Sequence, residues 1–246
     1  MTVVEICLDD LAGVRRAEEA GADRIELCAA LATGGLTPSI GTVTAALGVV
    51  RHIGVNVLIR QRPGDFVFDD DELAAMVADI RAVRALERPE GVTLGFVVGA
   101  LHPDGTVDAD ATRALVRACG DAPVTFHKAF DQTPDREAAL EELITLGVTR
   151  VLTSGGATTA PDGAVALAAL VAQAADRITV LAGGGVRPAN VADLVERSGV
   201  SEVHLRAVEQ APSASRVLSG YDSGMRDVTS SAIVAGVMDA LREVAA

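Results

Sequence analysis

The stretch AGADRIELC, residues 20–28, places a glycine directly before a strand-like run of residues. Gly21 stands where a helix takes a left-handed C-terminal cap, and the segment Arg24–Cys28 then has the composition of a strand. The same order returns at Leu146–Val151 and at Ser198–Val203. Three helix ends of this kind, each with a glycine before a strand, indicate a repeated unit of one strand and one helix.

The whole chain follows this alternation. Apolar runs predict eight strands, and the segments between them carry the spacing of helices. The predicted strands are Val3–Leu8, Arg24–Cys28, Val55–Arg60, Val92–Gly99, Val124–His127, Arg150–Thr153, Ile178–Ala182 and Glu202–Leu205. Eight strand–helix units in 246 residues predict an α/β fold, a (β/α)₈ TIM barrel forming one domain over residues 1–246.

An open, doubly wound sheet is the rival architecture. Such sheets usually carry a G-x-G-x-x-G loop after the first strand, and here Leu8–Leu11 reads LDDL. One connection in the predicted barrel is long, from residue 207 to about 228, and loops of that length are often lids. It contains Arg216, Tyr221 and Arg226.

Composition limits the partners. The net charge of −13 repels phosphate backbones and aromatic residues make up only 2%, so we expect no nucleic-acid partner. No apolar run approaches the roughly 20 residues of a membrane span, and the N-terminus does not resemble a signal peptide. Three cysteines form no disulfide framework, which favours a reducing cytoplasm. By analogy with other barrels, a homodimer is expected.

Polar residues alternate with aliphatic ones in the first two predicted strands. Alternate side chains of a strand point to opposite faces, so Glu5 shares a face with Cys7, and Glu26 shares a face with Cys28. Carboxylates and thiols turned into a barrel are costly unless they are paired or used. This pattern predicts the mouth of a site.

Other strands add to the same predicted mouth. Alternation turns Arg60 and Arg62 inward from the third strand, His127 from the fifth, and Glu202 and His204 from the eighth. A purely structural Glu–Arg pair could fill part of the barrel, but it would not account for both imidazoles and both thiols. The remaining histidines, at positions 52 and 102, are expected at the surface.

The two inward thiols allow a metal site. Neighbouring strands lie about 4.8 Å apart, so Cys7 and Cys28 could bind one Cu(I), a soft cation that prefers thiolates. The alternative is that both are small buried hydrophobic residues, which is the commoner fate of free cysteine. Cys119, on a predicted helix, is expected to pack in the core.

Glycine-rich loops allow an anion site. Thr153–Gly156 and Ala182–Val186 follow the sixth and seventh strands, where backbone amides can hold a phosphate or carboxylate. Gly183, Gly184 and Gly185 are the stronger candidates, with Arg62; tight turns are the alternative. Lys128 invites a Schiff base, but alternation turns it away from His127, which favours a salt-bridging residue at the rim.

These segments resemble the CutC family of copper homeostasis proteins. The resemblance runs through residues 5–7, 21–30, 34–39, 60–66, 124–131, 150–156 and 202–204. It implies a (β/α)₈ barrel, a cytoplasmic location and Cu(I) handling, with Cys7 and Cys28 as the suspected ligands. Lys128 stands where the family motif usually has arginine, so a cation is kept, and the chain after His204 matches poorly.

Two functions are therefore expected. The first is a copper homeostasis protein with Cu(I) at Cys7 and Cys28 and an imidazole nearby. The second is a barrel enzyme, lyase- or isomerase-like, acting on a small anionic metabolite with or without a phosphate group. In it Glu26 or His127 would be the general base, with His204 and Arg60 in the catalytic set. A scaffold barrel that works through its surface is a third interpretation, and the sequence singles out no such surface.

Overall fold

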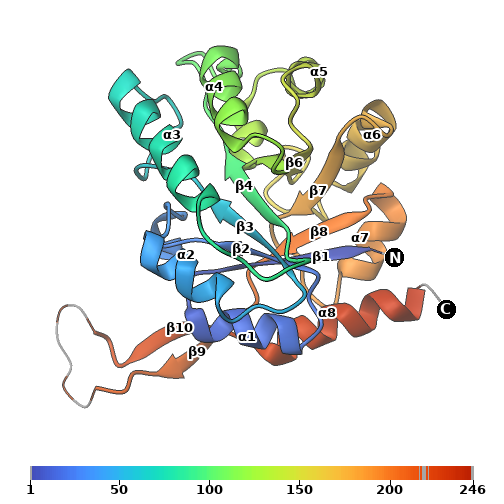
Figure 1. Ribbon diagram of the computed structural model, residues 1–246. Helices are drawn as coiled ribbons and strands as arrows, with labels where there is room; N and C mark the ends of the chain where they lie inside the picture. The colour runs from blue at the N-terminus through green and yellow to red at the C-terminus, as the bar shows by residue number, and fades with distance from the viewer. Residues whose placement is uncertain (1, 216, 218–219, 221, 245–246) are drawn as a thin grey trace.

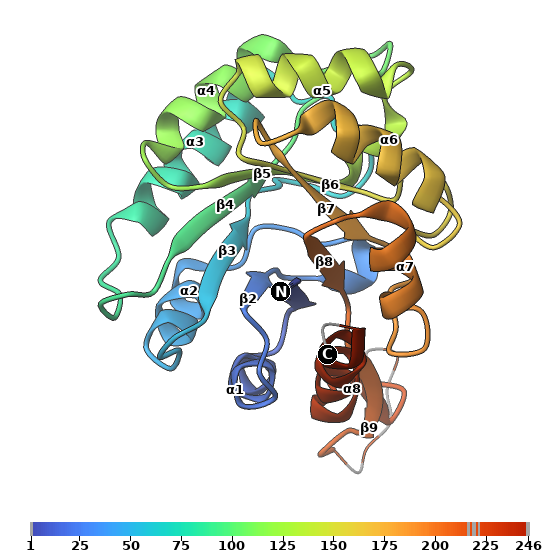
Figure 2. The ribbon, with the colours of Figure 1, turned by 90° about the vertical axis from the view of Figure 1, so that its right-hand side faces the viewer.

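Eight parallel strands close into a barrel in chain order, which confirms the predicted (β/α)₈ architecture (Figures 1 and 2). The computed structural model describes residues 2–215, 217, 220 and 222–244. The strands are β1 (Val3–Leu8), β2 (Arg24–Leu27), β3 (Gly54–Leu58), β4 (Leu94–Val98), β5 (Val124–Phe126), β6 (Arg150–Thr153), β7 (Thr179–Gly183) and β8 (Glu202–Leu205). Each lies within two residues of its predicted bounds.

Helices surround the barrel, and α8 lies beside α1 where the ring closes (Figure 2). They are α1 (Leu11–Glu19), α2 (Ile40–Leu47), α3 (Asp70–Arg84), α4 (Ala109–Cys119), α5 (Arg136–Thr145), α6 (Ala164–Ala174), α7 (Val191–Ser198) and α8 (Ser231–Val244), with short 3₁₀ turns η1 (Leu31–Thr33) and η2 (Lys128–Gln132). Within the described residues, none of these helices has the length and apolar character to cross a membrane.

Local sequence explains where the helices begin and end. The glycines of the three repeated helix ends have φ between +68° and +92°, the left-handed region that a helix cap requires; they are Gly21, Gly147 and Gly199. Asp69 and Glu72 form a capping box at the start of α3. The main core lies between strands and helices, where Val, Leu and Ile dominate and Phe96, Phe126 and Phe130 are the largest buried side chains.

The interior of the barrel is polar in the layer where β2, β6 and β8 begin. This layer, here called the floor, consists of Glu5, Arg24, Asn56, Arg150 and Glu202. Arg24 bridges two carboxylates, with Nε 2.5 Å from Glu5 Oε2 and Nη2 2.6 Å from Glu202 Oε2. Arg150 Nε donates to the same oxygen of Glu202 at 2.6 Å, and Asn56 Nδ2 donates to Glu5 Oε2 at 2.8 Å. Two arginines and two carboxylates therefore neutralise each other in a network that spans β1, β2, β6 and β8.

The segment after β8 differs from the prediction of a long loop. Val208–Pro212 (β9) and Met225–Thr229 (β10) pair as an antiparallel hairpin that extends away from the barrel (Figure 1). Its residues are mostly exposed, so its strands lack the apolar alternation that would have revealed them. Arg226 is exposed on β10, and Arg216 and Tyr221 lie outside the described residues.

Removing one charge from the floor network should be far more costly than removing one from the surface. Glu202→Gln leaves the partly buried Arg150 without a counter-charge and leaves Arg24 with Glu5 alone, and we expect a loss of about 3–5 kcal/mol in the free energy of unfolding. The control is Glu141→Gln, since Glu141 makes two hydrogen bonds with Arg177 at the surface, where solvent screens the pair and its loss should cost far less stability. Urea unfolding measures both; equal losses would show that the network does not hold the barrel.

Candidate functional site

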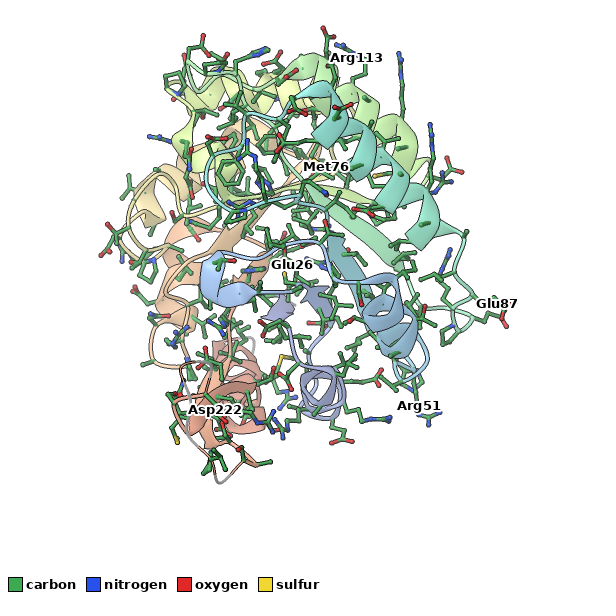
Figure 3. All side chains as sticks on the ribbon, turned by 90° about the vertical axis from the view of Figure 1, so that its left-hand side faces the viewer. Glu26, Arg51, Met76, Glu87, Arg113 and Asp222 are labelled. Atoms are coloured by element: carbon green, nitrogen blue, oxygen red, sulfur yellow. The ribbon has the colours of Figure 1, made fainter. Side chains whose placement is uncertain are left out.

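A cavity of about 160 Å³ lies inside the ring at the carboxyl ends of the strands. Figure 3 shows one of its residues, Glu26, at the centre of the barrel and far from the labelled surface residues. Barrels of this class build their sites at this end. The lining residues are Cys7, Glu26, Cys28, Leu31, Gly34, Leu58, Arg60, Phe66, His127, Lys128, Leu152 and His204.

The floor network supports His204 from below. Its Nδ1 lies 2.8 Å from Glu5 Oε1, while its Nε2 lies 3.7 Å from Glu26 Oε2. Strand register explains this contact, because Glu5 on β1 stands directly beside His204 on β8. The imidazole is thus held between a carboxylate of the floor and a carboxyl group of the cavity.

The two thiols meet beside this imidazole. Cys7 Sγ and Cys28 Sγ lie 3.8 Å apart, and both residues are buried. Cys7 Sγ also lies within 4.8 Å of donor atoms of Glu26 and His204. Since metal–sulfur bonds are about 2.3 Å long, two sulfurs at this separation can share one ion. The donor set therefore fits a soft metal ion.

These contacts divide charge within the cluster. Burial opposes ionisation of Glu5, but hydrogen bonds from His204 and Arg24 hold its pKa well below the usual range. Burial alone would lower the pKa of His204; contacts with Cys7, Glu5 and Glu26 outweigh it and raise that pKa well above 6.5. The hydrogen bond from Cys28 lowers the pKa of Cys7. Burial opposes this shift, but His204 adds to it, and the pKa falls to about 5. Burial raises the pKa of Glu26, and the negative charge of Cys7 raises it further.

Cys28 completes this distribution, because burial raises the pKa of its thiol well above 9.0. At neutral pH the cluster then holds a Cys7 thiolate, next to a His204 ring whose charged form is favoured and to Glu26 and Cys28, whose protonated forms are favoured. Such a cluster offers one soft anionic donor and one carboxyl group able to give up a proton.

His127 behaves differently from His204. Its Nδ1 accepts a hydrogen bond from Ala129 N at 3.2 Å, which places the ring proton on Nε2. Burial and the charge of Arg60 lower the pKa of His127 to about 3, so the ring is neutral at physiological pH. Because its Nε2 already carries a proton, His127 suits hydrogen-bond donation better than the role of general base that the sequence allowed.

Lys128 lies at the rim as expected. Its Nζ forms an ion pair with Asp131 Oδ2 at 2.6 Å and donates to Ser154 Oγ at 2.9 Å. Asp131 also accepts hydrogen bonds from the backbone amides of Ser154 and Gly156. The first glycine-rich loop, a predicted anion cradle, therefore holds a carboxylate of the protein itself.

Six of the predicted site residues share the cavity: Cys7, Glu26, Cys28, Arg60, His127 and His204. Arg62 does not, because β3 ends at Leu58 and the Arg62 side chain turns to Glu72 and Asp65. Gly183, Gly184 and Gly185 do not line it either; Gly183 and Gly184 lie beside Lys128, and an anion at this loop stays a prediction. Phe66 could not be predicted as a site residue, because it lies in a loop without periodicity. Arg24 and Arg150 were not predicted either, although strand alternation could have revealed them.

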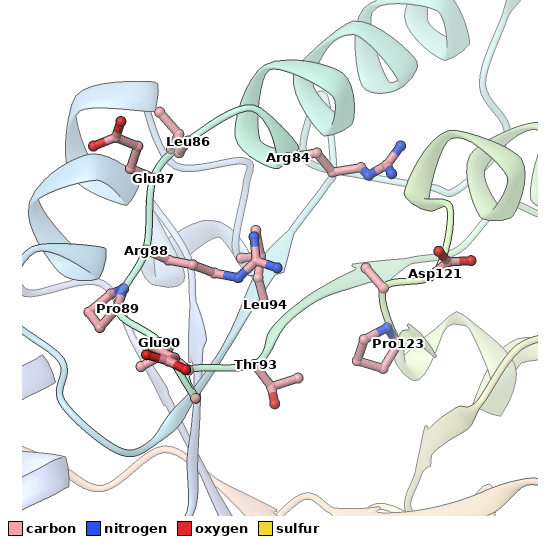
Figure 4. A pocket seen from close by; sticks show the side chains of 13 residues that line it. Arg84, Leu86, Glu87, Arg88, Pro89, Glu90, Thr93, Leu94, Asp121 and Pro123 are labelled. Carbon is pink, nitrogen blue, oxygen red and sulfur yellow. The ribbon is translucent and has the colours of Figure 1, made fainter.

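A larger cleft of about 790 Å³ lies at the opposite end of the barrel, where β4 and β5 begin (Figure 4). Arg84, Arg88, Glu87, Glu90 and Asp121 are among its lining residues, and Arg84 Nη1 already donates to Ala118 O. The cleft contains neither thiol nor imidazole. The smaller cavity is therefore the candidate site, because its lining brings buried thiols, a carboxyl group and imidazoles together, whereas the lining of the larger cleft does not.

Fold and cavity together define a (β/α)₈ barrel protein with a thiol, carboxyl and imidazole site at the carboxyl ends of its strands. The CutC family model matches residues 2–209. Relatives named as family protein CutC are 44% identical in Mesorhizobium japonicum (88% of this chain, 81% of the relative) and 42% identical in Chromobacterium violaceum (97% and 98%). The chain belongs to the CutC family, which confirms the resemblance seen in the sequence.

A solved structure agrees with this assignment. The crystal structure of a proposed copper homeostasis protein CutC from Streptococcus agalactiae is 34% identical, with a TM-score of 0.77, and the match covers 83% of this chain and 98% of that one. The part of the chain after residue 209, which includes most of the hairpin, lies beyond the family match.

Acid should destabilise the wild type partly through His127. The unfolded state protonates this ring below about pH 6.5 and the folded state only below about pH 3, so stability falls as the pH drops through that window. Between pH 7 and 5 the wild type should lose about 2 kcal/mol that the His127→Phe variant retains. Urea unfolding of both proteins at the two pH values measures the difference; parallel losses would contradict a neutral His127.

Proposed function

We propose that this protein acts in copper homeostasis by binding Cu(I) at Cys7 and Cys28 in the cytoplasm. The observation that carries the proposal is the pair of buried sulfur atoms 3.8 Å apart. Thiolates are the ligands that Cu(I) prefers, and His204 and Glu26 stand close enough to join or adjust the coordination. The description of the Streptococcus agalactiae protein supports the same role.

The surroundings of the thiols favour binding at neutral pH. A metal ligand must be deprotonated, and the lowered pKa of Cys7 provides one thiolate before the ion arrives. Cys28 would release its proton on binding, because a thiol must be deprotonated to bind a metal ion. Cys28 is 1% exposed, so the site favours retention of the ion over direct transfer at the surface.

All three cysteines are free and buried, which is compatible with a reducing compartment. Cys119 lies in the core at the end of α4, apart from the cavity, and burial raises the pKa of its thiol to about 12. This thiol has no role in the proposal and provides a matched control for the two that do.

A second candidate function is an enzyme acting on a small anion. A single observation favours it: His127 Nε2 and Arg60 Nε are buried in the cavity wall without a hydrogen-bond partner. Copper binding at the thiols gives no role to these donors. Glu26, whose pKa is raised by burial, would exchange a proton with the substrate, and the His204 imidazolium would stabilise developing negative charge.

Competition titration with Cu(I) under anaerobic conditions tests the copper proposal. Cys7→Ser and Cys28→Ser should each weaken binding by more than about 100-fold, beyond the usual cost of losing an outer-shell partner. Cys119→Ala should bind as the wild type does. If the Cys7→Ser, Cys28→Ser double variant binds Cu(I) as tightly as the wild type, the proposed site is wrong.

Native mass spectrometry of gently purified protein tests the enzyme candidate. The wild type should carry a small anion of definite mass, and Arg60→Ala should lose it because the buried cation is gone. Arg113→Ala is the control and should retain the ligand, because Arg113 lies on α4, pairs with Asp110 and does not line the cavity. An anion retained equally by Arg60→Ala would contradict the assignment.

A further inference from the structure

Two buried N–H groups of the cavity wall have no acceptor. His127 is 5% exposed and Arg60 is 6% exposed, yet His127 Nε2 and Arg60 Nε have no hydrogen-bond partner among the described residues. A buried donor without a partner destabilises the folded state, and folded proteins seldom retain such groups without a use. Both donors belong to the lining of one cavity.

Neighbouring groups hold both donors in place. Both donors pack against the Phe66 ring. The Arg60 guanidinium carbon lies 4.8 Å from the centre of this ring, and the centre of the His127 ring lies 4.7 Å from it. The terminal nitrogens of Arg60 donate to the carbonyl oxygens of Gly34, Gly35 and Gly64, so Nε is the nitrogen of this side chain that has no partner among the described residues. These contacts fix the donors before any ligand enters, so binding would not have to order them.

Arg60 also makes no close ion pair with a carboxylate of the described residues. No carboxylate oxygen of the described residues lies within 4.0 Å of its nitrogens, whereas Arg24 and Arg150 are paired with carboxylates in the floor. The acceptors of Arg60 are neutral backbone carbonyls. A buried, unpaired cation beside a neutral N–H donor favours an anionic ligand.

The surroundings select the kind of anion. The amides of Ser154 and Gly156, which could have held a phosphate, already donate to Asp131. The cavity of about 160 Å³ holds roughly five water volumes of about 30 Å³ each, which limits a ligand to a few heavy atoms. Leu31, Leu58 and Leu152 supply apolar walls.

We propose that this cavity binds a small, unphosphorylated carboxylic acid whose carboxylate accepts hydrogen bonds from Arg60 Nε and His127 Nε2. The proposal rests on the second candidate function and names its substrate class. The carbon atoms next to the bound carboxylate would share the cavity with Glu26, Cys7 and His204, the groups able to exchange a proton with them.

Binding of small probes to metal-free protein tests the proposal. Acetate and pyruvate labelled with ¹³C should show saturable binding by NMR, and the His127 Nε2 proton should shift when either probe is added. Arg60→Gln should weaken binding about tenfold or more, because it removes a charge-assisted hydrogen bond, and His127→Phe should weaken it about three- to tenfold. Arg62→Gln, two residues along the chain but outside the cavity, should change affinity less than twofold.

Each contrary result has a distinct meaning. Equal weakening by Arg60→Gln and Arg62→Gln, or an unmoved His127 proton at saturation, would overturn the proposed site. Inorganic phosphate binding as tightly as acetate would overturn the carboxylate class. If a phosphorylated anion co-purifies while neither probe binds, the enzyme candidate survives and this proposal fails. Cys119→Ala, which changes a thiol in the core and outside the cavity, should bind both probes as the wild type does.

Discussion

The ion network at the floor of the barrel is the constraint on which the rest of the structure depends. Arg24 and Arg150 share Glu202, and Arg24 also binds Glu5, so four strands are joined by buried charges that must stay paired. Glu5 also orients His204, because its other oxygen, Oε1, lies 2.8 Å from His204 Nδ1. The floor therefore determines both the register of the strands and the orientation of the imidazole above it.

The charges of the floor influence the pKa values of the groups in the cavity. The Glu5 carboxylate favours a charged His204, and His204 in turn favours the Cys7 thiolate, while burial raises the pKa values of Glu26 and Cys28 and so favours their protonated forms. Arg60 and His127 form a separate set in the wall of the same cavity, where Arg60 Nε and His127 Nε2 have no hydrogen-bond partner among the described residues. A soft metal ion and a small carboxylate would thus use different atoms of one cavity, so the two proposed functions do not exclude each other.

The sequence predicted the barrel and most of the site for one physical reason: side chains of a buried strand alternate strictly. That rule placed Cys7, Cys28 and His204 correctly, and it fails where a strand ends, as at Arg62, whose backbone has left the sheet. Contacts from loops, such as Phe66 against His127, carry no periodic signal. The hairpin of β9 and β10 escaped prediction because its exposed strands bury no alternating face.

The most direct test of this account is the protonation of the two buried histidines, read from ¹⁵N chemical shifts of the imidazole rings between pH 5 and 8. The account predicts that His204 carries protons on both nitrogens throughout this range, while His127 stays neutral with its proton on Nε2. A His204 ring that is neutral at pH 7 would contradict the account, because the floor would then not control the charge of the cavity.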